Sequence, residues 1–318
     1  MGQRVEQTAQ LIAPNDDAPA AGPPPGGPVR RVARVFTHHP RLGLSATLGA
    51  PVMWLLVVYI GSLLLLVVTA FFKLDTTTQK PTSELTLDNL NVAFTTSEFV
   101  WTVIRSIGVA LAVTVLCLVI ALPMAFYIAK VAKPWARRGL IVAVLLPLWG
   151  GYLVKGYAWR AMFSPGSKFS ASGGGGVLDS TIGWTPGFGQ TALVITLAYQ
   201  WLPYMVLPIY AGLDRLPASL LDASADLGGR PLRTFRSIVG PMIVPSIAAG
   251  SIFTFSLSLG DYIMPNIVGG TTQLIGNLIA RTLLAPNQPL AAAFTLWPII
   301  IIVVYLATMS RLKAFDNL

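Results

Sequence analysis

The chain has 318 residues, of which 54% are hydrophobic and only 11% are charged, and its mean hydropathy is +0.66. A soluble domain usually carries about 25% charged residues, so this chain has too few charges to cover a water-facing surface of normal size. The composition excludes an ordinary soluble protein and predicts that most of the surface faces lipid. A single cysteine also excludes an intrachain disulfide or a cysteine metal site.

Residues 1–45 are expected to form a disordered tail with a basic end. The segment is rich in Ala, Pro and Gly, shows no apolar periodicity and lacks the compact apolar core of a secretory signal. We therefore expect two regions: this tail, and a membrane domain over residues 46–318.

Six apolar stretches follow, each long enough for a helix that crosses a membrane, which takes about 20 residues. In chain order they cover residues 50–72, 100–129, 139–162, 191–213, 241–263 and 292–309. The third, fourth and fifth contain prolines and glycines, and lipid cannot satisfy the backbone groups that a proline frees. Such spans are typical of helices packed around a path, with ordinary helix packing as the alternative. The predicted fold is an all-α membrane protein with six transmembrane helices.

The distribution of positive charge predicts the orientation of these helices. If the N-terminus is cytoplasmic, both termini and most Lys and Arg residues lie inside, as the positive-inside rule requires. Of the 22 Lys and Arg residues, the 15 inside are Arg4, Arg30, Arg31, Arg34, Arg41, Lys130, Lys133, Arg137, Arg138, Arg215, Arg230, Arg233, Arg236, Arg311 and Lys313. Membrane orientation thus explains the net charge of +9, and nucleic-acid binding is not predicted.

The segment LLDASADLGGRPLRTFRSIVGP, residues 220–241, is polar and lies between the fourth and fifth spans, on the predicted cytoplasmic side. We expect one helix over residues 217–226, ended by Gly228 and Gly229, and a second over residues 231–238. The second helix has an apolar face and a basic flank, formed by Leu232, Phe235 and Ile238 and by Arg230, Arg233 and Arg236. Such a block suits docking to another protein; a loop lying on the inner leaflet is the alternative.

The same segment resembles the EAA loop of ABC-importer permeases, whose pattern is Glu-Ala-Ala, three residues, Gly, nine residues, Ile, one residue and Leu-Pro. Every spacing holds, although Asp222, Ser224 and Gly240 replace the Glu, Ala and Leu of the pattern. The resemblance implies that residues 214–241 form a coupling loop that inserts into a cleft on a separate ATPase. Its implied coupling residues are Asp222, Ala223, Ser224, Gly228, Arg230, Arg233, Phe235, Ile238 and Pro241.

The resemblance also implies a complex in the bacterial cytoplasmic (inner) membrane, in which this chain is no enzyme. The expected partners are two copies of an ATP-binding subunit that holds ATP and Mg, a second homologous permease subunit, an extracytoplasmic solute-binding protein and membrane lipid. The glycine tract 173–176 agrees, because it lacks the Lys and Ser or Thr that a phosphate loop needs, and we expect a flexible loop there. A membrane-embedded enzyme would need clustered acids or metal ligands, which the spans lack; a non-transporting scaffold is the remaining alternative.

Three stretches point to the solute. LPLWGGYLVKGYAWRAMFSP (146–165), SLGDYIMPNIVGG (258–270) and LIGNLI (274–279) are similar to the first permease subunit of bacterial spermidine/putrescine importers. This resemblance implies a polyamine substrate. Importers of iron(III), thiamine, phosphonate or opines are the alternatives within the same class.

Asp261, near the outer end of the fifth span, is the first candidate for the substrate path, because an acid at membrane depth is costly and marks function by default. Aromatic faces and carboxylates suit a flexible polycation. The candidate path residues are Asp261, Tyr262, Tyr199, Trp201, Tyr204 and Trp159. The alternatives are that the aromatic residues pack helices or form an interface belt, and that Asp261 is exposed or pairs with Arg105, Lys155 or Arg160.

Overall fold

A computed structural model of the chain describes residues 40–75, 80–164, 178, 181 and 185–311. The predicted tail up to residue 39 and the glycine tract 173–176 lie outside these residues. The chain divides into two units, residues 1–64 and residues 65–318.

The described part of the first unit is helical. Helix α3 (Pro40–Thr69) begins at Pro40 and carries the first apolar run into the second unit. Residues 40–45 of the predicted tail are therefore helical. Every residue from 51 to 60 is exposed, and an apolar surface of this kind is suited to lipid or to a partner helix.

The second unit is mainly helical, with one short hairpin. In chain order its described elements are the antiparallel strands β1 (Phe72–Leu74) and β2 (Pro81–Leu85), α4 (Asp88–Thr95), α5 (Ser97–Phe126), the π-helical turn η1 (Tyr127–Val131), α6 (Pro134–Trp149), α7 (Tyr152–Phe163), α9 (Gln190–Asp214), α10 (Ala218–Asp226), α11 (Pro231–Thr234), the π-helical turn η2 (Phe235–Val239), α12 (Gly240–Leu259), α13 (Met264–Ile267), α14 (Ile275–Leu284) and α15 (Gln288–Arg311).

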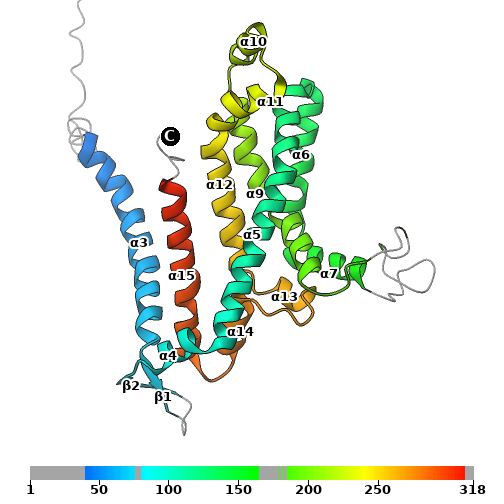
Figure 1. Cartoon of the computed structure of the whole chain (residues 1–318). Coiled ribbons are helices and arrows are strands. Elements are labelled where there is room, and N and C mark those ends of the chain that lie inside the picture. The colour runs from blue at the N-terminus through cyan, green and yellow to red at the C-terminus, as the bar shows by residue number, and fades with distance from the viewer. Residues whose placement is uncertain (1–39, 76–79, 165–177, 179–180, 182–184, 312–318) are drawn as a thin grey trace, which may run out of the picture. The chain divides into compact units, whose positions relative to one another are not determined.

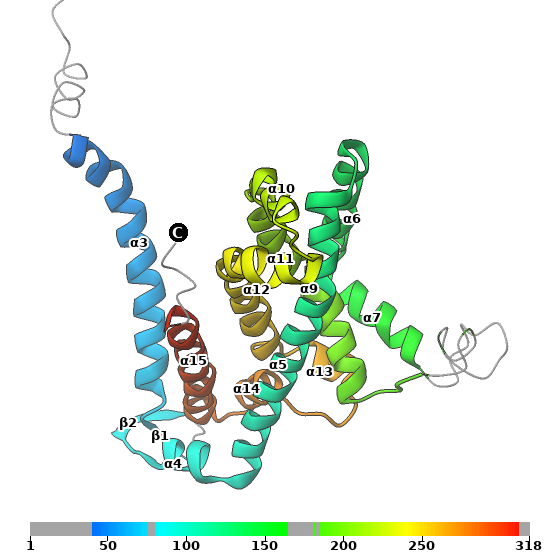
Figure 2. The ribbon, with the colours of Figure 1, turned by 45° about the horizontal axis from the view of Figure 1, so that its top comes forward.

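Helices α5, α9 and α12 pack against one another and form the centre of this unit (Figures 1 and 2). Cys117 on α5 and Leu197, Met205 and Ile209 on α9 are fully buried in their shared core. In a membrane such contacts are stabilised mainly by close packing, because lipid is as apolar as the core itself. A second core joins α12 to α15 and α4 through Leu259, Phe294 and neighbouring residues.

Five described helices are long and apolar enough to cross a membrane, and the pair α6 and α7 forms a sixth if it is one span. The stretch expected as the third span, residues 139–162, is broken in the structure, where α6 and α7 meet at an angle of 93°. Gly150 and Gly151 between them are extended, just after Pro147. Because glycine loses more conformational freedom in a helix than other residues, this Pro-Gly-Gly combination favours a break over a kink.

The fifth span is longer than expected and includes the second helix of the polar segment. The sequence suggested separate helices over residues 231–238 and 241–263, but Pro231–Leu259 is one helical segment. The π-helical turn η2 precedes Pro241, and the N–H of Gly240 reaches back to the carbonyl of Phe235. This wider turn leaves room for the proline ring, which would strike the carbonyl one turn earlier in a regular α-helix.

The connection between α12 and α15 contains a helix that the sequence did not indicate, α14. Its start is fixed by polar contacts: the Asn277 side chain accepts from the N–H of Leu274 at 2.7 Å, and Ser106 Oγ on α5 accepts from the N–H of Ile275 at 2.8 Å. Both N–H groups are buried, so the LIGNLI stretch is held by side chains instead of by water.

Replacing Ser106 by Ala should lower the thermal stability of the protein in detergent. The change leaves the buried N–H of Ile275 without its acceptor, which costs about 1–3 kcal/mol. Thr308→Ala is the matched control, because that exposed hydroxyl only donates to a carbonyl of its own helix. Equal melting midpoints for the two variants would contradict this role of Ser106.

Candidate functional site

Helix α10 and the turn after it form the first half of the predicted coupling loop. The helix starts after Pro217 and ends where Gly228 adopts a left-handed φ of 72°. The N–H of Gly229 then donates to the carbonyl of Ser224 at 2.8 Å. A left-handed glycine after a helix is a common C-cap, and it turns the chain toward α11.

The corner between α10 and α11 is tightly packed around Gly229. A Cβ at this position would lie 2.6 Å from the Ser224 carbonyl oxygen, so a larger residue would force the backbone apart. The hydroxyls of Ser224 and Thr234 are hydrogen-bonded at 2.7 Å across the same corner. Ser224, which replaces an Ala of the family pattern, therefore ties the two halves of the loop together.

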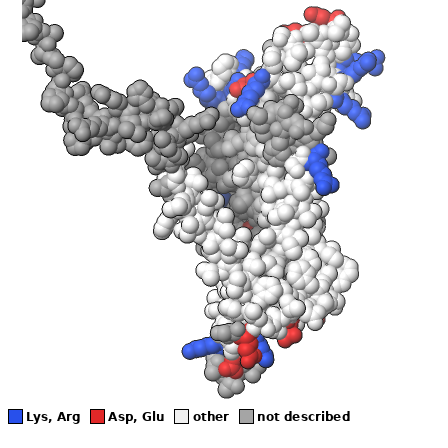
Figure 3. Space-filling view, turned by 90° about the vertical axis from the view of Figure 1, so that its left-hand side faces the viewer, with Lys and Arg blue, Asp and Glu red and all other residues white. Residues whose placement is uncertain are grey.

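The loop presents both charged and apolar side chains to its surroundings. Leu227 and Leu232 are 89% and 78% exposed, and a hollow of about 420 Å³ lies between α10 and the η2 turn. Figure 3 shows Lys, Arg, Asp and Glu side chains gathered at this end of the second unit, above a wide band without charge. Exposed leucines beside charged groups are suited to a protein partner.

The predicted coupling residues divide into an exposed and an inward set. Asp222, Ala223, Gly228, Arg230, Arg233 and Pro241 are exposed. Phe235 packs against the helical core, and Ile238 is half-buried at the edge of the hollow. Leu232 and Phe235, which the sequence places on one face, therefore differ in the structure: Leu232 is exposed and Phe235 is half-buried.

Asp261 lies between α12 and α13 and is only 5% exposed. Its Oδ1 accepts from the N–H groups of Ile263 at 3.0 Å and Met264 at 2.9 Å, and its Oδ2 accepts from the Tyr152 hydroxyl. The backbone of Gly276 lies against the same residue, and a Cβ there would be 2.5 Å from the Asp261 carbonyl oxygen. Asp261 therefore joins α7, α13 and α14.

Two of the three cations weighed as partners for Asp261 contact other groups, and the third, Arg105, is exposed. Lys155 donates to the carbonyl of Pro147 at 3.0 Å. Arg160 donates to the carbonyl of Ile267 at 2.5 Å and lies over the Phe188 ring. Among the described residues no ion pair joins a cation to Asp261, and its carboxyl oxygens accept from N–H and O–H donors instead.

The predicted aromatic residues form two clusters and one outlier. Trp201 and Tyr204 belong to a row of four rings. The distances between neighbouring ring centroids are 6.0 Å from Tyr152 to Trp201, 5.8 Å from Trp201 to Tyr204 and 6.4 Å from Tyr204 to Phe253. This row crosses α7, α9 and α12 and ends at the hydrogen-bond partner of Asp261.

The second cluster joins Trp159 to Tyr199 at 5.5 Å and to Phe163 at 5.1 Å, between α7 and α9. Tyr262 belongs to neither cluster: it is 52% exposed and lines a separate hollow with residues of α14 and α15.

Two buried polar atoms beside the row have no partner in the described structure, Gln200 Oε1 and Trp201 Nε1. Gln200 is fully buried, and its amide nitrogen reaches the Tyr152 carbonyl only at 3.5 Å. Buried polar groups are normally paired, so each exception asks for an explanation. Sequence reasoning missed Gln200, Tyr152 and Phe253; an amide within an apolar span was the available signal for Gln200.

Known proteins show a consistent similarity to this chain. Residues 118–314 match the family of binding-protein-dependent transport system inner membrane components. The inner membrane ABC transporter permease protein YdcU of Escherichia coli (strain K12) is 42% identical over 91% of this chain and 95% of that protein. The spermidine/putrescine transport system permease protein PotB of the same strain is 33% identical over 55% of this chain and 64% of that protein.

The fold has a counterpart among solved structures. A bacterial ABC transporter involved in the import of the acidic polysaccharide alginate matches with a TM-score of 0.64 at 17% identity, over 88% of this chain and 98% of that one. This likeness bears on the fold alone and agrees with the predicted all-helical membrane architecture. From the family match and the extent of the YdcU alignment, this chain belongs to the multi-pass inner-membrane permeases of binding-protein-dependent ABC importers, which leave ATP hydrolysis to a separate subunit.

Proposed function

We propose that this permease imports polyamines such as spermidine and putrescine. By family it works with an ATPase and a periplasmic binding protein. The proposed complex adds a second homologous permease chain and a second ATPase copy, with ATP and Mg held by the ATPases. The observation that carries the proposal is the row of rings from Tyr152 to Phe253, which has a buried carboxylate at one end and an unpartnered amide oxygen beside it.

The chemistry of this row suits a polyamine. A polyamine alternates ammonium groups with short methylene chains, and a ring face attracts each ammonium by about 0.5–2 kcal/mol. Gln200 Oε1 can accept a hydrogen bond from an ammonium, and the ring faces can cover the methylenes. The similarity to the spermidine/putrescine permease PotB supports the same solute class.

The loop supports a mechanical role for the chain. Because Pro231–Leu259 is one helical segment, movement of the loop is passed directly into the fifth span. Closure of two ATPases would bring the loops of the two permease chains together and open the substrate path on the other side of the membrane. The binding protein supplies most of the affinity in this proposal, and the permease supplies a weak, transient site.

Cells that lack their own polyamine importers should take up labelled spermidine or putrescine when they carry this chain with its partners. Uptake should saturate and should stop on energy depletion. Asp261→Asn should lower uptake although the complex still assembles, because the amide keeps an oxygen for the N–H groups of Ile263 and Met264 but loses the charge and the acceptor for the Tyr152 hydroxyl. No uptake from an assembled complex would overturn the polyamine assignment and favour iron(III), thiamine, phosphonate or opines.

Gln200→Met should lower the rate of spermidine import at saturating solute by about 10–100-fold, the equivalent of a lost hydrogen bond from a charged donor. The thermal midpoint should be unchanged or higher, since the variant removes a buried oxygen that has no partner in the protein. Gln190→Met, at an exposed position that begins α9, is the control. A lower midpoint with an unchanged import rate would assign Gln200 a packing role instead.

Gly229→Ala should reduce the amount of ATPase that co-purifies with the permease. The added Cβ would open the corner between α10 and α11, while the helical bundle keeps its melting midpoint. Gly139→Ala is the matched control, because a Cβ at that position in α6 meets nothing within 4 Å. Full retention of the ATPase by Gly229→Ala would contradict the docking role of the corner.

A further inference from the structure

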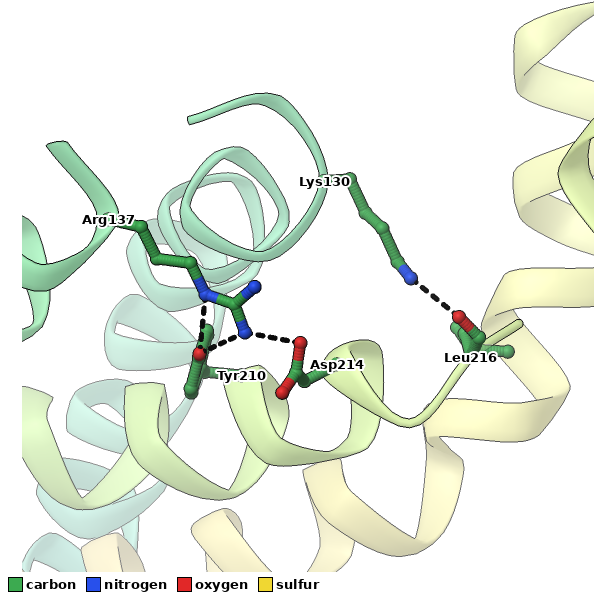
Figure 4. A network of polar contacts seen from close by, with 5 residues as sticks. All are labelled: Lys130, Arg137, Tyr210, Asp214 and Leu216. Carbon is green, nitrogen blue, oxygen red and sulfur yellow. Dashed lines mark hydrogen bonds and ion pairs between the residues drawn. The ribbon is translucent and has the colours of Figure 1, made fainter. Parts of the chain in front are cut away.

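A cluster of polar contacts holds the last turn of α9 to the start of α6 (Figure 4). Arg137 Nε donates to the Tyr210 hydroxyl at 2.7 Å, and a second guanidinium nitrogen donates to the same hydroxyl and to the Asp214 carboxylate. The guanidinium also lies 5.2 Å from the centre of the Tyr210 ring. One arginine thus grips two residues spaced one helical turn apart.

A second contact lies just beyond the end of α9. Lys130, in the π-helical turn η1, donates from Nζ to the carbonyl of Leu216 at 2.7 Å. Leu216 is buried and lies in the three-residue linker 215–217 that joins α9 to α10. The lysine therefore holds the backbone directly before the coupling helix.

Both cations come from one short stretch of chain, residues 127–137, which ends α5 and begins α6. Their partners are the last turn of α9 and the linker to α10, as Figure 4 shows. We call Lys130, Arg137, Tyr210, Asp214 and Leu216 together the root clamp.

The root clamp contributes little to the folding stability of the protein. The Arg137 and Asp214 side chains are 31% and 45% exposed, and exposed ion pairs usually contribute under about 1 kcal/mol. Helix α9 is already held by a long buried face, on which Leu197, Met205 and Ile209 are fully buried. The clamp instead fixes the position of α6 and η1 relative to the linker before α10.

We propose that the root clamp makes the α5–α6 connection move together with the coupling loop during ATP-driven transport. Arg137 and Lys130 then act as positioning residues, and the inference rests on the proposed role of the loop. Movement of α10 would pass through the clamp to α6 and across the bend to α7. Tyr152 at the start of α7 bonds to Asp261, so this route ends at the polar cluster beside the aromatic row.

The test uses the complete importer in lipid vesicles, with ATP hydrolysis and solute import measured in the same preparation. Arg137→Gln and Lys130→Met should each lower the solute imported per ATP about tenfold, within the usual range of coupling energies. ATP hydrolysis by the partner should stay near that of the wild type. Arg138→Gln is the matched control, because that neighbouring arginine is exposed and makes no hydrogen bond or ion pair with the described residues.

A charge swap separates coupling from folding. Arg137→Asp combined with Asp214→Arg restores an ion pair with reversed signs, and it should recover import lost in Arg137→Asp alone. Parallel loss of assembly, hydrolysis and import in Arg137→Gln, without recovery by the swap, would reduce the clamp to a structural contact. Unchanged import per ATP in both single variants would overturn the proposal outright.

A distance measurement tests the clamp whatever the solute is. Spin labels at the exposed positions of Arg138 and Asp226, in a Cys117→Ala background, report the separation of α6 and α10. The separation should stay the same with and without ATP in the wild type, and it should change in Arg137→Gln. A wild-type separation that changes with ATP would overturn the clamp, whereas a wild type that imports no polyamine would overturn only the proposed solute.

Discussion

Each backbone N–H and C=O group within a bilayer needs a partner inside the protein, and this requirement governs where the helices of this chain break. At the bend between α6 and α7, Lys155 donates to the carbonyl of Pro147. After α12, Asp261 accepts from two N–H groups at the start of α13, and the Asn277 side chain accepts from the N–H of Leu274, the residue before α14. The polar side chains near these breaks therefore form hydrogen bonds with backbone groups, and this leaves fewer of their polar atoms available to bind a solute.

This use of polar groups limits what Asp261 can offer to a cation. A carboxylate has about four acceptor positions, and three of these are taken by Tyr152, Ile263 and Met264. The Gln200 oxygen, which has no partner in the described structure, and the ring faces beside it are more available to bind a cation. A site of this composition binds weakly, and weak binding suits a permease that must release its solute.

The helical spans could be predicted from the sequence because a run of about 20 apolar residues has few alternatives to a membrane helix. Pro147, Gly150 and Gly151 indicated a distortion in the third span, but they did not give the sharp bend between two helices, because hydropathy is the same for a straight and a bent apolar segment. Helix α14 was missed for a similar reason: its start depends on Ser106, which lies 169 residues away in the chain. The π-helical turn before Pro241 is a response to crowding that periodicity does not reveal.

The proposed coupling loop and the aromatic row also differ in how far the sequence alone predicts them. The pattern of the proposed coupling loop is local, so the spacing from Asp222 to Pro241 could be read directly from the sequence. The aromatic row joins α7, α9 and α12, and a sequence alone does not say which of its many rings face each other. Tyr262, which adjoins Asp261 in the chain, points to a different hollow and shows how far adjacency can mislead.

The two ends of the proposed coupling loop also differ mechanically. At its C-terminal end the loop continues as a helix into α12, and the hydrogen bonds of a helix carry movement along its axis without outside help. At its N-terminal end a short linker separates α10 from α9, and a linker can absorb movement by rotating about its φ and ψ angles. Lys130 and Arg137 bind at this second end, where contacts from outside the loop are needed for movement to be passed on.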